Sequence, residues 1–238
     1  MLKTREIREF FHSPIFYVVM AVFLALSGYK FFSLLLSFIE SMSYYPEYIY
    51  GDNIGSMMNL HAAYYIFPQL FMFYSYLCVM AVSVLDLNLG RDRMLGLDKV
   101  ELLSGNKSVL GLVLRKSLST SVVVCSMMVP TLLYPAIISV FTELDWGMIL
   151  SAYLGLFILV GLSSGIVSVA GVFKIPFAVG IFLNMVILLS LNFYFFEHMF
   201  SPFFFGTIRL DVLILSTLLF FFAVSLAKRL YISVRIYV

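Results

Sequence analysis

Residues 148–173 read MILSAYLGLFILVGLSSGIVSVAGVF and contain no charged side chain. A helix needs about 20 apolar residues to cross the hydrocarbon core of a bilayer, and this stretch is long enough to do so. Five more stretches of similar character lie on either side of it. The sequence therefore predicts six membrane-spanning helices, at residues 14–39, 62–85, 117–141, 148–173, 175–196 and 212–227.

The composition of the whole chain supports the same class of protein. Of the 238 residues, 62% are apolar and 12% are charged, and the mean hydropathy is +1.03. Soluble domains carry about 25% charged residues. A net charge of +2 is too small to indicate a nucleic acid as a partner. We therefore expect an all-α polytopic membrane protein, with residues 1–238 forming a single transmembrane domain. The first apolar run is too long for a cleavable signal, and no small-residue cleavage site follows it.

The basic residues lie mainly on one side of the predicted membrane. Thirteen of the fifteen Lys and Arg residues are at the N-terminus, between the second and third helices, at Lys174, or at the C-terminus. Lysine and arginine are retained on the cytoplasmic side during insertion. We therefore expect a multi-pass protein of the bacterial inner membrane with both termini in the cytoplasm. Arg209 and Lys30 lie on the other side, and Lys30 is expected to snorkel from the first helix.

Residues 1–13 have the pattern of an amphipathic helix. Ile7, Phe10 and Phe11 recur at helical spacing, while Arg5 and Arg8 occupy other faces. Such a helix, placed just before a spanning segment, is expected to lie flat among the lipid headgroups. The alternative is a charge cluster that only sets the topology.

Residues 86–116 form the only long polar connection on the predicted cytoplasmic side. Gly96 and the Gly105-Asn106 pair are turn signals that predict two short helices. Three apolar residues stand among the charges, which favours a docking element over a solvated loop. The candidate docking residues are Arg91, Asp92, Arg93, Gly96, Leu97, Lys99, Val100, Glu101 and Leu103.

The stretch 192–211 combines eight aromatic residues with Glu197, His198, Pro202 and Gly206. It is too polar to span a membrane and too apolar to float free in water. A re-entrant or interface-lying hairpin on the outer side, before the last helix, meets both constraints, because irregular backbone at membrane depth must be covered by protein or water.

Signatures of catalysis are weak. The chain contains no phosphate-binding G-x-x-x-x-G-K-[ST] motif. The segment Gly161–Gly165 spells G-x-S-x-G, as in serine hydrolases, but it stands in the middle of a predicted spanning helix.

The three histidines are far apart in the sequence, and they form no i, i+4 pair or set with carboxylates that would bind a metal. Cys78 and Cys125 are expected to be small apolar residues of the bundle. No acidic residue is expected near the centre of a span, which disfavours an ion-coupled carrier. We therefore expect neither an enzyme nor a cofactor in this chain.

Several short segments resemble a known family. They are Lys3–Phe11, Ser13-Pro14, Gly28-Tyr29, Leu133-Tyr134-Pro135, Leu144–Gly147, Tyr153–Gly155, and Gly206 with Arg209 and Asp211. In this order, and with six helices, the chain resembles the type-2 ABC exporter permeases, especially their gliding-motility-associated branch.

The resemblance implies that this chain is one subunit of a larger transporter complex. Such permeases work in pairs, either two copies or two homologous chains, and each docks on a cytoplasmic ABC ATPase that binds ATP and Mg. An accessory subunit with a large extracytoplasmic domain often accompanies this branch. The family's coupling loop reads Glu-Glu, then Gly-Thr, then Glu. Here Gly96 is kept and Asp92 replaces one acid, but Lys99 stands where the later Glu is expected.

Two other functions remain open at this point. A six-helix substrate-capture subunit of an energy-coupling-factor vitamin importer has a similar length, but it requires no charged amphipathic N-terminal helix. An intramembrane serine protease would use the G-x-S-x-G segment. Co-purification with an ATPase separates the first two functions from the protease, and direct contact of that ATPase with residues 90–107 separates the exporter from the importer.

Overall fold

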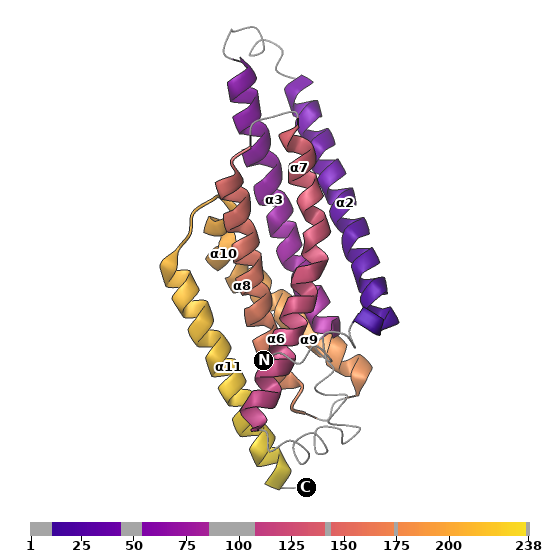
Figure 1. Cartoon of the computed structure of the whole chain (residues 1–238), viewed down its shortest axis with the longest axis vertical. Coiled ribbons are helices and arrows are strands. Elements are labelled where there is room, and N and C mark those ends of the chain that lie inside the picture. Colours follow the sequence, from indigo (N-terminus) through magenta and orange to yellow (C-terminus); the bar gives the residue numbers. More distant parts are fainter. Residues whose placement is uncertain (1–10, 44–53, 86–107, 141–143, 174–175, 237–238) are drawn as a thin grey trace.

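The computed structural model describes residues 11–43, 54–85, 108–140, 144–173 and 176–236, and every regular element in these ranges is a helix (Figure 1). Six helical paths are long and apolar enough to cross a membrane. They are Pro14–Glu40, Tyr64–Leu85, Val109–Ser139, Trp146–Ala170, Ala178–Phe204 and Leu210–Ser233. The prediction of six spanning helices is confirmed, and the chain is a multi-pass membrane protein.

Four of the helices are single uninterrupted rods. They are α2 (Pro14–Ser43), α3 (Ile54–Leu85), α8 (Trp146–Ala170) and α11 (Leu210–Ile236). The start of α2 at Pro14 coincides with the predicted start of the first span. Asp145 caps α8, because its carboxylate accepts hydrogen bonds from the first backbone N–H groups of the helix.

The third path begins earlier than predicted and is broken near its far end. Residues 109–116, which we assigned to the 86–116 connection, form the first two turns of α6 (Val109–Met128). The Ser108 hydroxyl caps this helix by accepting from the N–H of Gly111. The path then passes through a 3₁₀ turn, η2 (Val129–Leu132), into α7 (Leu133–Ser139). Pro130 lacks an N–H donor, which explains the break in the α-helix.

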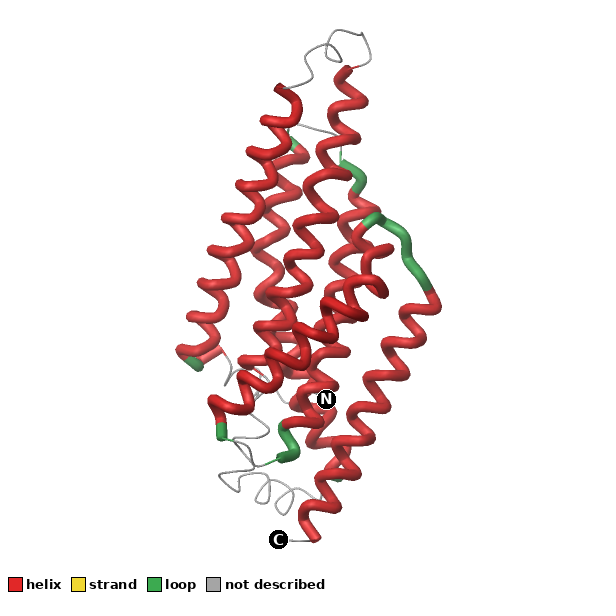
Figure 2. The backbone as a smooth tube through the Cα atoms, turned by 180° about the vertical axis from the view of Figure 1, so that it is seen from behind, coloured by secondary structure: helices red, strands yellow, loops and turns green. Residues whose placement is uncertain are grey.

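Helices α3 and α8 form the centre of the bundle. Within their membrane-length segments, 67% of α3 and 61% of α8 are buried, against 22% of α2 and 28% of α11. Helix α8 packs on α3, α6, α10 and α11, while α3 also packs on α2 and α9. The outer helices therefore surround a two-helix core (Figures 1 and 2).

Glycines let two neighbours approach α8 closely. A Cβ added at Gly155 would lie 2.7 Å from the Cβ of Phe203, and one added at Gly165 would lie 2.7 Å from Cδ2 of Phe220. The Ser151 hydroxyl, on the same helix, donates to the backbone carbonyl of Phe203. Small residues allow such packing between spanning helices, where lipid tails supply no hydrophobic driving force.

The fifth path is longer than predicted. It runs from α9 (Phe177–Leu191) through a π-helical turn, η3 (Asn192–Phe196), into α10 (Glu197–Phe204). The backbone N–H of Glu197 donates to the carbonyl of Asn192, five residues earlier, which marks the π-turn. The structure does not show the hairpin that we expected over residues 192–211, because most of that stretch continues the helix.

A glycine cap ends this path before α11 begins. Gly206 has a φ of +87°, a conformation that glycine adopts without steric cost. The N–H of Thr207 donates to the carbonyl of Pro202, and the N–H of Gly206 donates to that of Phe203. This is the Schellman pattern, and it turns the chain sharply toward α11.

Candidate functional site

Most of the predicted site residues lie outside the described residues. Those of the docking element, Arg91, Asp92, Arg93, Gly96, Leu97, Lys99, Val100, Glu101 and Leu103, all belong to 86–107, and Arg5, Ile7, Arg8 and Phe10 belong to 1–10. Phe11 is described, and its ring packs edge-on against Phe16 with 4.8 Å between the ring centres. The coupling role and the interfacial helix therefore stay predictions.

The helix ends that flank residues 86–107 are described. Helix α3 ends at Leu85, which is buried, and α6 starts after its cap at Ser108. Both helices pack on α8 and on each other. A displacement of the connection between them would therefore act on the centre of the bundle.

A cluster of buried serine hydroxyls joins α6 to α8. The Ser164 hydroxyl lies 2.8 Å from the hydroxyl of Ser117 and 2.8 Å from that of Ser121. Ser121 donates to the carbonyl of Ser117, and all three side chains are buried. We call Ser117, Ser121 and Ser164 the serine seam. Hydroxyls paired in this way hold spanning helices together.

Ser164 of the serine seam is the fourth residue of the G-x-S-x-G segment, directly after the serine position of the motif, Ser163. Gly161–Gly165 lies wholly within α8, so the strand-to-helix turn required by a hydrolase elbow is not formed there. Ser164 bonds two other hydroxyls, while Ser163 is buried in the bundle and its hydroxyl has no hydrogen-bond partner among the described residues. The geometry of this segment is that of helix packing.

A second polar contact joins the 3₁₀ turn to α8. The Thr131 hydroxyl donates to the carbonyl of Met128 and lies 2.8 Å from the hydroxyl of Tyr153. Because the only proton of Thr131 is already used, Tyr153 is the donor. Nearby, the ring of Tyr134 stacks on Phe31, which ties η2 and α7 to α2.

A third polar contact joins α3 to the fifth path, and the sequence did not predict it. The Tyr76 hydroxyl donates to Oε2 of Glu197 at 2.6 Å, and the Asn192 amide donates to the hydroxyl of Ser75 at 3.1 Å. Asn192 is fully buried, and its Oδ1 has no hydrogen-bond partner among the described residues. Because we ended the fifth span at residue 196, Glu197 was assigned to an outer loop.

The extended path adds an acidic residue to a membrane-length segment, whereas we expected only that none lies near the centre of a span. Glu197 belongs to the segment Ala178–Phe204, which is long and apolar enough to cross the membrane. One signal was available in the sequence, namely that Asn192 and Glu197 stand five residues apart in an otherwise aromatic run. That spacing acquires meaning only once the π-turn is known.

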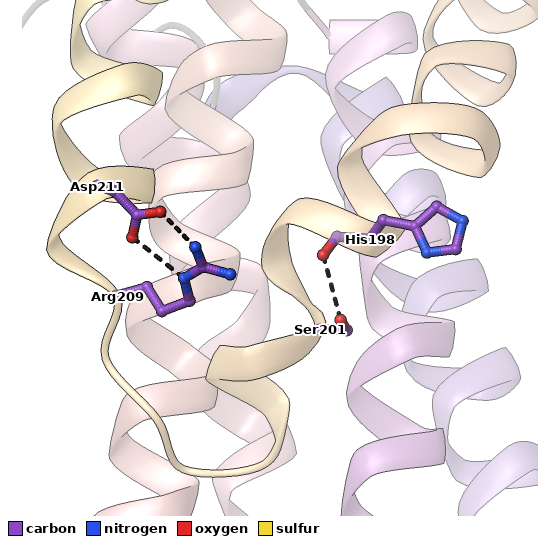
Figure 3. A network of polar contacts seen from close by, with 4 residues as sticks. All are labelled: His198, Ser201, Arg209 and Asp211. Atoms are coloured by element: carbon purple, nitrogen blue, oxygen red, sulfur yellow. Dashed lines mark hydrogen bonds and ion pairs between the residues drawn. The ribbon is translucent and has the colours of Figure 1, made fainter.

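An ion pair marks the connection between the fifth path and α11. The Arg209 guanidinium donates to both carboxylate oxygens of Asp211, and both side chains are exposed (Figure 3). This hydrogen bonding, and then the attraction of the carboxylate, raises the pKa of Arg209 above its ordinary value. The imidazole of His198 points away from this pair (Figure 3).

Comparison with known protein families, curated proteins and solved structures found no match. Among the described residues, no three His, Cys, Asp or Glu side chains are grouped so that they could hold a metal ion.

Proposed function

We propose that this chain is the membrane-spanning permease subunit of an ATP-driven ABC transporter, which exports a substrate or transmits force across the bacterial inner membrane. A separate cytoplasmic ABC ATPase binds ATP and Mg and supplies the energy. The chain itself holds no cofactor and performs no catalysis. Its partners are that ATPase, a second permease chain, an accessory subunit with a large extracytoplasmic domain, and membrane lipids.

One arrangement carries the proposal. Residues 86–107 connect α3 to α6, and both helices pack on the central helix α8. A partner that binds this connection thereby gains direct mechanical access to the core of the bundle. The apolar residues Leu97, Val100 and Leu103, set among basic ones, suit such a contact.

The proposed orientation follows from the basic residues. With both termini and residues 86–107 in the cytoplasm, the Lys and Arg excess lies on the side where insertion retains it. Residues 1–13 would then lie along the cytoplasmic headgroups beside the ATPase. The short resemblances to the gliding-motility-associated permeases support the same assignment.

The test replaces Leu97 and Val100 with Asp. An apolar contact loses its buried centre when charge is introduced, so ATPase recovered with the permease in mild detergent should fall about tenfold or more. The matched control replaces Tyr45 and Tyr48, on the opposite side of the membrane, with Asp and should retain the ATPase. Recovery of the ATPase at the wild-type ratio with the Leu97 and Val100 variant would show that this connection is not the docking site.

A further inference from the structure

The fifth path joins the bundle through a narrow buried stripe that is rich in amides. Between residues 180 and 192, the buried residues are Gly180, Asn184, Leu188 and Asn192, each four residues after the last. The side chains between them are exposed or half-buried. Residues four apart share a face of a helix, so these four form one line along it. Two of its three side chains are asparagines, a residue type that is mostly exposed in proteins.

This stripe faces α3. Outside its own path, α9 packs mainly on α3, and the Asn192 amide donates to the hydroxyl of Ser75 on that helix. Further along α3, Val79 and Ser83 follow Ser75 at the same four-residue spacing, and all three are buried. We give the name amide seam to this contact, which consists of Ser75, Val79 and Ser83 on α3 and of Asn184, Leu188 and Asn192 on the fifth path.

The two halves of the amide seam match residue by residue. Helix α3 and the fifth path are the second and fifth of six crossings, and they run in opposite directions (Figure 1). Ser83 follows Ser75 by eight residues, and Asn184 precedes Asn192 by eight, which is about 12 Å along each helix. The hydrogen bond between Ser75 and Asn192 therefore puts Ser83 level with Asn184.

Each asparagine keeps an unpaired polar atom inside the seam. Asn192 is 0% exposed and its Oδ1 has no hydrogen-bond partner among the described residues, and the same holds for Nδ2 of Asn184, which is 3% exposed. The hydroxyl protons of Ser75 and Ser83 are not available, because both already go to carbonyls of their own helix. A buried amide atom without a partner is costly, so each is expected to bind a species from outside the chain.

The two unpaired atoms need opposite partners. Oδ1 of Asn192 is an acceptor and needs a donor, whereas Nδ2 of Asn184 is a donor and needs an acceptor. A metal cation or an ammonium group would suit only the first, and an anion only the second. Water both donates and accepts, so it suits both. Beside Asn184, a water molecule can accept from Nδ2 and donate to the hydroxyl oxygen of Ser83.

We propose that the amide seam binds internal water, with one molecule at Asn184 and another at Asn192. Buried waters in proteins bond polar groups that are otherwise unsatisfied, and the serines of α3 are small enough to leave space for them. The contact of α3 with α9 is then bridged by water, whereas the hydroxyls of the serine seam bond one another directly. The water at Asn192 also lies about one helical turn from Glu197, an ionisable residue that needs protein or water beside it.

A substitution separates a hydrated amide from a dry one. Asn184→Leu keeps nearly the same shape but removes the donor. Loss of a dry, unpaired donor would raise the melting temperature by several degrees. With water bound, the substitution also displaces that molecule, so the melting temperature should stay the same or fall. Val186→Leu, at an exposed position of the same helix, is the control and should change nothing. A rise with Asn184→Leu that the control does not show contradicts the site at Asn184.

Radiolytic labelling detects the water in the unchanged full-length protein, purified in mild detergent. Radiation splits water into hydroxyl radicals, and a radical formed from a bound water oxidises the side chain next to it. Val79 lies in the amide seam, and Val224 lies in an apolar cluster of α6, α8 and α11; both are 0% exposed.

Val79 should be oxidised several times faster than Val224, and a radical scavenger confined to the bulk solvent should not slow it. Equal rates for the two valines, or a Val79 rate that the scavenger abolishes, would overturn the proposal. Neither experiment requires the ATPase, so the water site and the permease function can fail separately.

Discussion

The serine seam and the contact of Tyr76 with Glu197 both lie between helices long enough to cross a membrane, but they differ in how completely they are paired. In the seam, the buried hydroxyl of Ser164 bonds the buried hydroxyls of Ser117 and Ser121 across the α6–α8 contact. In the contact of α3 with α10, one hydrogen bond joins Tyr76 to one carboxylate oxygen of Glu197, and both side chains are half-buried. A satisfied polar group indicates a contact that is complete within one chain. An ionisable group at the surface of the bundle needs protein or water beside it, whereas the buried Oδ1 of Asn192 stays unpaired among the described residues.

Among these contacts, the close packing of α8 against α10 should contribute most to the free energy of unfolding. Gly155→Ala places a Cβ 2.7 Å from the Cβ of Phe203, and that atom cannot move without the backbone. We expect a loss of about 2 kcal/mol in the free energy of unfolding, typical of overpacking. Thermal unfolding in detergent measures it. Gly161→Ala is the matched control, because nothing lies within 4 Å of its Cβ, and it should be neutral or slightly stabilising. Equal effects of the two substitutions would contradict the close contact of α8 with α10.

The hydrogen bond between Tyr76 and Glu197 should rank second. Tyr76→Phe removes the hydroxyl that bonds Glu197 and should lower the free energy of unfolding by about 1–2 kcal/mol. Tyr17→Phe, at an exposed tyrosine on α2, is the control and should change nothing measurable. Should Tyr76→Phe behave as Tyr17→Phe does, the hydrogen bond between α3 and α10 does not stabilise the chain.

The serine seam should show the smallest effect. Ser164→Ala removes both hydroxyl contacts between α6 and α8, yet hydrogen bonds between spanning helices contribute only about 0.6 kcal/mol on average. We expect a loss of about 1 kcal/mol by the same measurement. Ser126→Ala, whose hydroxyl bonds only its own helix, is the control. A Ser164→Ala effect larger than that of Gly155→Ala would reverse the ranking and make hydroxyl pairing, not packing, the dominant interaction of α8.

The sequence predicted the six crossings because apolar length is a local property. No side chain in residues 148–173 carries a charge, and no partner is needed to recognise such a stretch as a spanning helix. The predicted start of the third span at residue 117 was late because Arg115 and Lys116 suggested a loop, whereas the structure places them in the second turn of α6.

The end of the fifth span was predicted wrongly for a different reason. Glu197, His198 and Pro202 each lower the apolar character of the stretch, and together they predicted that the helix ends at residue 196. In the structure, Tyr76 of α3 bonds Glu197, and Ser75 bonds Asn192. These partners lie more than a hundred residues away in the sequence, so no local sequence pattern predicts the two hydrogen bonds.

The sequence alone therefore determined that this protein is a multi-pass helical membrane protein and where most of its spans lie, because hydrocarbon selects for apolar length one helix at a time. It also marked the connection between α3 and α6 as the one long polar segment. Tertiary structure alone decided which helices form the centre, that Ser164 joins α8 to α6, and that Glu197 belongs to a helical path long enough to cross a membrane. Those features depend on contacts between distant helices, and a side chain is buried, paired or exposed only once its neighbours are in place.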